Sequence, residues 1–285
     1  MVNDKIKIAF FGNSDFSLLI LEDLKKLGIL PEIVVTTPDK PQGRKMIITP
    51  TQTKVWAEEH SIEYIEQNKL KDEKFLEKMK NYNLYLVASY GKIIPKELID
   101  IPKFKVLNIH PSLLPKYRGP SPLQEQIINN EQNIGVSVML IDEYVDHGPV
   151  LVQEKVPIFN WPISFNELSK TLSEVGTRIL AENLTNYVRG KLAPKEQKDE
   201  DATFTKKIEK IDGLIDLNSD SYKNYLKYLA YENWPGVFFE VEKDGIKKKI
   251  IIKKAEFKEG QMKILKVVPE GKKEMSYEDF LRGQR

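Results

Sequence analysis

Short apolar segments alternate with helix-like segments through the first half of this chain, and this alternation restricts the possible folds more than any other feature. Four of the apolar segments read as buried strands, over residues 6–12, 32–37, 84–89 and 105–110. The first is followed by a predicted helix that begins near Ser14 and ends at Gly28. Strands interleaved with helices favour an α/β fold with a mostly parallel, Rossmann-like sheet covered on both faces.

The same region contains further elements. Three more helices are predicted, over residues 51–61, 72–82 and 121–130. The segments GVSVMLID at 135–142 and PVLVQEKVPI at 149–158 indicate antiparallel outer strands. A long amphipathic helix over residues 165–190 is expected to close this first domain.

The character of the chain changes after residue 190. Residues 191–206 are rich in charge and include a proline, which is typical of a linker. The elements expected beyond it are one helix and three strands, over residues 221–231, 236–242, 247–257 and 261–269. A hairpin turn joins the first two of these strands. We therefore expect a domain over 1–190, the linker over 191–206, and a β-rich, OB-like domain over 207–285. Too few residues remain after Trp234 for a complete five-stranded OB barrel.

Composition excludes several classes of chemistry. Cysteine is absent, which removes disulfides, thiolate nucleophiles and cysteine-based metal sites. The histidines are His60, His110 and His147, and they lack the spacing of zinc ligands, so no metal is expected. The first residues read as a strand rather than a signal peptide, and no apolar run approaches the length of a membrane span. We expect a cytoplasmic protein without a membrane partner.

The strand at 105–110 ends in two polar residues, Asn108 and His110, that precede the loop PSLLPKYRGPSP. Residues two apart on a strand point to the same face, so the amide and the imidazole can bind one oxygen together. Such a pair can stabilise the negative charge that forms during acyl transfer. Downstream, Asp146 offers a carboxylate that can orient the imidazole or accept a proton. With no Cys or activated Ser, this set favours direct transfer of a carbonyl group to an amine.

Two parts of the chain carry clustered cations. The loop at 38–45 is rich in turn residues and contains Lys40, Arg44 and Lys45. It is either a lid that binds an anionic substrate or an ordinary surface loop. From Thr203 onward the chain has 18 Lys and Arg against 14 Asp and Glu. This mildly basic balance is compatible with a nucleic-acid substrate and equally with a solvated surface.

Several motifs occur here together that are known from one family. They are GNSDF, TPDKPQGRK at 37–45, ASYGKIIP at 88–95, NIHPSLLPKYRGPSP at 108–122, DEYVDHGP at 142–149, and PEGKKEMSYEDFL near the C-terminal end. On these motifs the chain resembles the methionyl-tRNA formyltransferases, a branch of the folate-dependent formyltransferases. The 108–122 segment with its downstream Asp is specific to the wider group. The 37–45 loop and the two-domain layout narrow the resemblance to the tRNA enzymes.

The resemblance implies that the formyl donor is 10-formyltetrahydrofolate and that the acceptor is initiator methionyl-tRNA. We expect the protein to be a monomer. The resemblance makes Asn108, His110 and Asp146 the catalytic group. The residues it assigns to the folate site are Ser112, Leu113, Leu114 and Pro115, with Tyr90 and Gly91 flanking the pocket. It implies that the loop with Lys40, Arg44 and Lys45 contacts the tRNA. By their charge, Lys247, Lys248 and Lys249 can face the tRNA backbone as an electrostatic surface. Tyr90 can instead pack in the core, and Arg118 and Gly119 either contact substrate or shape the loop through an ion pair.

Other functions share parts of this pattern. A nucleotide-sugar N-formyltransferase would use the same folate site and the same three residues, and it is the main alternative. A glycinamide ribonucleotide transformylase normally lacks the second domain, and a formyltetrahydrofolate hydrolase would use water as the acceptor. A catalytically silent RNA-binding protein would not need Asn108, His110 and Asp146 to be intact.

Overall fold

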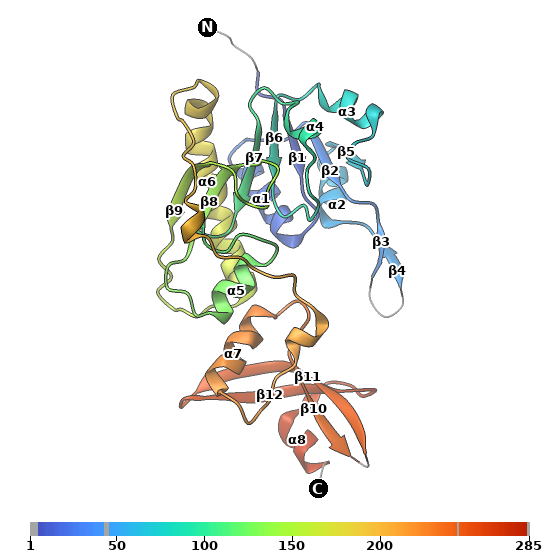
Figure 1. The fold of residues 1–285 in the computed structure, drawn as a ribbon. Coiled ribbons are helices and arrows are strands. Elements are labelled where there is room, and N and C mark those ends of the chain that lie inside the picture. The colour runs from blue at the N-terminus through green and yellow to red at the C-terminus, as the bar shows by residue number, and fades with distance from the viewer. Residues whose placement is uncertain (1–4, 43–45, 244, 284–285) are drawn as a thin grey trace. The chain divides into compact units, whose positions relative to one another are not determined.

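A seven-stranded sheet organises the first part of the chain (Figure 1). The computed structural model describes residues 5–42, 46–243 and 245–283. The strands of the sheet, in spatial order, are β5 (Glu63–Glu66), β2 (Ile33–Thr36), β1 (Ile8–Phe11), β6 (Leu84–Val87), β7 (Val106–His110), β8 (Gly135–Leu140) and β9 (Val150–Lys155). The first five run parallel, and β8 and β9 pair antiparallel at the outer edge. The predicted mostly parallel α/β fold is confirmed.

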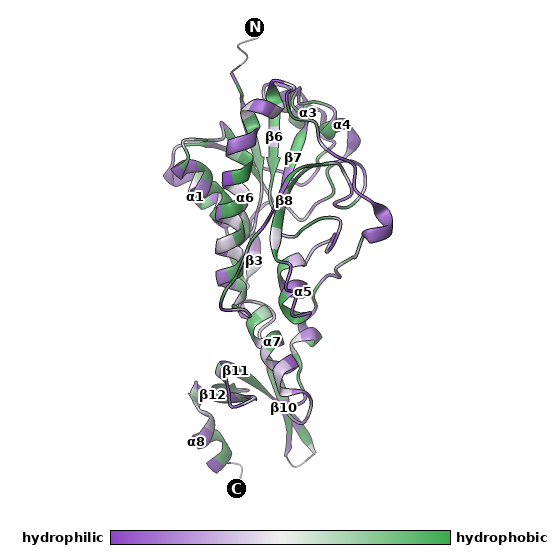
Figure 2. Ribbon diagram, turned by 90° about the vertical axis from the view of Figure 1, so that its left-hand side faces the viewer, coloured by the Kyte–Doolittle hydropathy of each residue, from purple (hydrophilic) through white to green (hydrophobic). Residues whose placement is uncertain are grey.

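Helices cover both faces of this sheet. Figure 2 shows α1 (Asp15–Lys26) and α6 (Phe165–Val188) on one side of the strands, and α3 (Glu73–Met79) and α4 (Lys96–Ile99) on the other. Helix α2 (Gln52–Glu59) packs beside α1. A capping box between Ser14 and Ser17 fixes the start of α1, because it satisfies main-chain N–H groups that have no partner within the helix. No helix in the described parts of the chain is long and apolar enough to cross a membrane.

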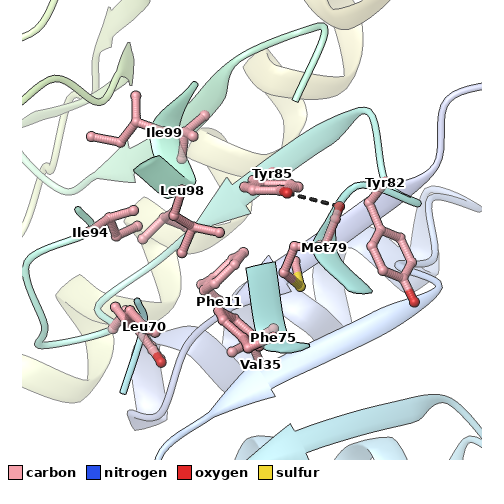
Figure 3. Close-up of a cluster of buried hydrophobic side chains, with 14 of the residues drawn as sticks. Phe11, Val35, Leu70, Phe75, Met79, Tyr82, Tyr85, Ile94, Leu98 and Ile99 are labelled. Carbon is pink, nitrogen blue, oxygen red and sulfur yellow. Dashed lines mark hydrogen bonds between the residues drawn. The ribbon is translucent and has the colours of Figure 1, made fainter. Parts of the chain in front are cut away.

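A cluster of buried side chains fills the space between the sheet and helices α3 and α4 (Figure 3). Phe11 lies in it with Phe75 and Met79 of α3, and the Tyr85 hydroxyl donates to the Met79 carbonyl oxygen at 2.9 Å. The neighbouring Phe10 is equally buried but, by strand alternation, points to the opposite face. Burial on both faces explains why these parallel strands read as continuous apolar runs.

The chain forms two compact units, and the second is discontinuous in sequence. It comprises residues 121–132, 158–168 and 206–285, whereas the first comprises 1–120, 133–157 and 169–205. Helix α5 (Pro122–Ile128), which precedes β8 in sequence, therefore packs with the C-terminal part, against α7 (Ser221–Ala230). The predicted boundaries at residues 190 and 206 remain a proposal.

The second unit contains a four-stranded antiparallel sheet in the order β10 (Phe238–Lys243), β11 (Ile246–Lys258), β12 (Gln261–Pro269) and β13 (Met275–Ser276). The predicted small β-rich domain and its first hairpin are confirmed. Helix α8 (Tyr277–Arg282) follows the short last strand and buries Phe280.

Four short elements of the first unit, β5, α4 and the two strands of a small hairpin, were not predicted from the sequence. Strand β5 lies at the edge of the sheet, so its residues are only half-buried and carry no continuous apolar run. Helix α4 is a single turn. The cationic loop contains a small hairpin, formed by β3 (Lys40–Gln42) and β4 (Ile47–Thr49). These elements depend on pairing or packing rather than on an apolar run of their own.

Two leucines of the α1 region test how far burial sets the stability of this fold. Leu24 is fully buried, whereas Leu27, three residues later, is 48% exposed. We expect Leu24→Ala to lower the free energy of unfolding by about 2–5 kcal/mol, because it leaves a cavity. Leu27→Ala should cost less than about 1 kcal/mol. Urea unfolding followed by tryptophan fluorescence measures both; equal losses would contradict this account of the core.

Candidate active site

Strand β7 places Asn108 and His110 on one face of the sheet. Val106, at the start of the strand, points into the cluster under α3 and α4, and alternation puts Asn108 and His110 on the same face. Ile109 points the other way, towards α6, where a Cβ on Gly176 would lie 2.7 Å from its Cγ2 atom. The apolar side of the strand thus anchors it while the polar side chains line the opposite face.

The Asn108 amide is nearly enclosed by protein, at 8% exposure. Within the described residues its side chain has no protein hydrogen-bond partner, and its amide atoms are not among the fully buried atoms without a partner, so a ligand or solvent can reach them. An amide in this state can donate from Nδ2 to an oxygen placed beside the strand. This fits the predicted role as a donor to a substrate oxygen.

The imidazole of His110 has one nitrogen committed to the protein and one left for chemistry. Nε2 lies 3.0 Å from the Tyr117 carbonyl oxygen, and because a carbonyl only accepts, Nε2 carries the hydrogen. The other nitrogen, Nδ1, faces Asp146, with 3.7 Å between Nδ1 and Oδ2. In the neutral ring Nδ1 is therefore a proton acceptor.

Asp146 reaches this position through a tight loop between β8 and β9. Its backbone is left-handed, with φ of 48°, and its Oδ2 accepts a hydrogen bond from the Gly119 N–H at 2.7 Å. Two residues later the chain passes so close to β8 that a Cβ on Gly148 would lie 2.1 Å from the Leu140 carbonyl oxygen. Only glycine fits there, and its place fixes the path of the loop.

The segment predicted to line a folate site is a loop held by the two outer strands. Ser112 is fully buried, and its hydroxyl donates to the Lys116 carbonyl oxygen at 2.7 Å. The Ser137 hydroxyl of β8 donates to the Ser112 carbonyl oxygen and accepts from the Leu114 N–H. Gln153 of β9 donates to the Leu114 carbonyl oxygen. Ser112 and Leu114 thus shape the loop, while Leu113 and Pro115 are only half-buried.

Tyr90 and Gly91 differ in what they can offer a ligand. The Tyr90 ring is 2% exposed and packs edge-on against Phe11, so its side chain belongs to the core. Only its main chain remains for the proposed folate contact. Gly91 is exposed, and a Cβ there would meet nothing within 4 Å. Its left-handed φ of 72° by itself favours glycine, and its place beside the folate stays a prediction.

The cationic loop is attached to the domain by an ion-pair cluster. Lys54 of α2 donates from Nζ to Asp39 at 2.9 Å and to Glu66 at 3.1 Å, and these hydrogen bonds raise the pKa of the lysine. Lys40 begins the hairpin and is exposed. Arg44 and Lys45 lie outside the described residues, so their tRNA role stays a prediction.

The three C-terminal lysines assigned to tRNA lie on β11 but not on one face. Alternation places Lys247 and Lys249 on one side of the sheet and Lys248 on the other. Lys247 lies 3.8 Å from Glu240, and Lys249 Nζ lies 3.4 Å from the centre of the Phe238 ring. Lys248 thus starts on the opposite face from the other two lysines, and the tRNA role of all three stays a prediction.

A network of hydrogen bonds and an ion pair next to Asp146 was largely not predicted from the sequence. Arg118 is 3% exposed and forms an ion pair with Asp199 at 2.9 Å, which supports the interpretation that it shapes the loop. Gln197 joins Arg118 to the Asp146 loop. Both Gln197 and Asp199 fall in the segment read as a linker, where charge and polarity gave no sign of a structural role.

Comparisons with known proteins identify the family of the chain. The formyl transferase family matches residues 6–184. A methionyl-tRNA formyltransferase from Thermodesulfovibrio yellowstonii is 35% identical over 98% of this chain and 96% of its own length. A solved methionyl-tRNA formyltransferase from Clostridium thermocellum has a TM-score of 0.60 at 18% identity, covering 93% of this chain and 99% of its own. A sugar N-formyltransferase from Shewanella sp has a TM-score of 0.61 at 18% identity, covering 85% and 95%. At 18% identity these two structures show the shared fold alone.

His147 provides a test of the network by pH. Its hydrogen bond to Asp142, at 2.6 Å, raises the pKa of the imidazole, and the Asp199 carboxylate adds to this. The folded state therefore favours the proton, so the pair stabilises the protein below about pH 6.5 and loses that effect as pH rises through the raised pKa. We expect His147→Gln to lower stability at pH 5.5, by less than about 1 kcal/mol because the pair is partly exposed, and to be near neutral at pH 9. Urea midpoints at both pH values measure this; an equal loss at both would refute it.

Proposed function

This chain belongs to the methionyl-tRNA formyltransferase family of formyl transferases, and we propose that it transfers the formyl group of 10-formyltetrahydrofolate to the α-amine of initiator methionyl-tRNA. The observation that carries this proposal is the 35% identity to a methionyl-tRNA formyltransferase along 98% of the chain, which includes the C-terminal unit. The likeness to a sugar N-formyltransferase is one of fold alone. A sugar amine is therefore the second candidate acceptor.

The geometry supports a division of roles between Asn108 and His110. As the amine adds to the formyl carbon, the formyl oxygen becomes negative, and the Asn108 Nδ2–H can donate to it. His110 Nδ1 is the free acceptor, because Nε2 is held by the Tyr117 carbonyl oxygen. It can take the proton of the amine, directly or by way of the nearby Asp146 carboxylate. The bond from the formyl carbon to the folate nitrogen then breaks, and that nitrogen regains a proton from the same group.

The remaining parts of the chain supply binding. The loop of Ser112, Leu113, Leu114 and Pro115 is proposed as one wall of the folate site, with its shape fixed by Ser137 and Gln153. The hairpin that begins at Lys40 is proposed to contact the tRNA. We also propose that the protein acts as a monomer in the cytoplasm, where aminoacylated tRNA is made and used.

The decisive experiment offers both acceptors to the purified protein. With 10-formyltetrahydrofolate present, we expect formyl-methionyl-tRNA to form, and no formylated nucleotide amino sugar. Asn108→Ala should lower kcat by about 100-fold, since it removes one donor to the oxyanion. Asn81→Ala, at an exposed asparagine, serves as the matched control and should leave kcat unchanged. Formylation of the sugar alone would overturn the proposed acceptor, and near-full activity of Asn108→Ala would overturn its role.

The Lys54 cluster predicts how the hairpin is held towards tRNA. Lys54→Met leaves the Asp39 and Glu66 carboxylates close together without their cation, which should displace the start of β3. We expect the KM for methionyl-tRNA to rise about 3- to 10-fold while the KM for the folate changes little. The control is Lys71→Met, which breaks the exposed pair with Glu97 and should change neither constant. If Lys54→Met raised both KM values equally, the cluster would have a general structural role instead.

A further inference from the structure

Asp146 is held through both its main chain and its carboxylate. Its left-handed backbone is unfavourable for a non-glycine residue, so its conformation depends on neighbours that support it. Gln197 supplies two such contacts. Its Nε2 donates to the Asp146 carbonyl oxygen at 2.9 Å and to the Gly148 carbonyl oxygen at 2.8 Å. These two hydrogen bonds hold the loop on either side of His147.

The orientation of the Gln197 amide is fixed by a buried cation. Arg118 donates from Nε and Nη2 to Gln197 Oε1, at 3.1 and 2.9 Å. Because a guanidinium only donates, the oxygen of the amide must face Arg118 and the NH₂ group must face the loop. Arg118 is itself tied to Asp199 at 2.9 Å, and Asp199 lies 3.5 Å from His147.

The segment that contains Gln197 and Asp199 also acts on the Asp146 carboxylate, by way of Gly119. The Arg118 N–H donates to the Thr203 carbonyl oxygen at 2.9 Å, and the Thr205 N–H donates to the Arg118 carbonyl oxygen at 2.7 Å. These bonds hold Gly119, whose N–H donates to Asp146 Oδ2. A Cβ on Gly119 would lie 2.7 Å from the Thr205 hydroxyl, so the two segments are in close contact. Residues 197–205 thus fix both the backbone and the side chain of Asp146.

We infer that Gln197 is a positioning residue for the transfer reaction, setting the distance between the Asp146 carboxylate and His110 Nδ1. This inference rests on the proposed function. The separation is 3.7 Å, close to but beyond hydrogen-bond length, so a small movement of the loop decides whether the two groups share a proton. Misplacement by about 1 Å can cost on the order of 100-fold in rate.

Gln197→Glu tests the inference with almost no change of shape. The carboxylate still accepts from Arg118, but its second oxygen replaces the NH₂ group and faces two carbonyl oxygens, which repels the loop. We expect kcat to fall about tenfold or more and the pH profile of kcat to shift, while both KM values stay within about twofold. Gln132→Glu makes the same change at an exposed site and should alter none of these constants. A kcat within about twofold of wild type, with an unshifted pH profile, would overturn the inference.

A second readout separates this inference from the proposed function. The chain has only three histidines, so the imidazole signals of His110 can be followed by NMR without any substrate. We expect Gln197→Glu to shift the His110 signals in the same direction as Asp146→Asn does. If wild type fails to formylate methionyl-tRNA, the proposed function falls, while shifted His110 signals still support the positioning role and unshifted ones refute it.

A third variant covers the case in which Gln197→Glu does not fold. Asp199→Asn removes the negative charge that pairs with Arg118. Because the Asp199 side chain is 66% exposed, this change should leave the fold intact. We expect it to lower kcat about twofold to fivefold with unchanged KM values, a smaller effect in the same direction. An unchanged kcat in this variant would count against the inference.

Discussion

Strand β7 pairs with a parallel strand on one side and an antiparallel strand on the other, and the candidate active site depends on this double pairing. Asn108 is opposite Val87 of β6 and Met139 of β8, so its register is fixed from both sides. A slip of one residue would turn Asn108 and His110 towards α6 and bury them in an apolar layer. The apolar residues Leu107 and Ile109 therefore select the face on which the chemistry can occur.

The outer strands and the segment after α6 then complete what β7 begins. Ser137 and Gln153 use buried polar groups to shape the loop that follows His110. Arg118 and Gln197 do the same for the loop that carries Asp146. A buried guanidinium is costly unless it is paired, and here Asp199 and an amide oxygen satisfy it. Side-chain hydroxyls and amides of distant segments thus hold the main chain of the loops that carry or follow the residues proposed to act.

How much of this could be foreseen depends on where each signal lies. Buried parallel strands such as β1 and β6 carry their own apolar runs, so they were predictable. The edge strand β5 and the hairpin of β3 and β4 are defined by pairing partners, which periodicity does not report. The membership of α5 in the second unit depends on packing against α7, although its sequence neighbours lie in the first. Gln197 looked like part of a polar linker because its partners are about 50 and 80 residues away.

Local patterns were enough to predict the α/β class, the shared face of Asn108 and His110, and the family resemblance, because strand period and motifs are properties of short segments. The tertiary fold set the distances and the partners. It placed Asp146 beside His110 Nδ1 and paired Nε2 with the Tyr117 carbonyl oxygen. It also buried the Tyr90 ring in the core. Loop conformation and the packing of separate elements fix these features, and the period of a strand does not encode which groups outside it will meet.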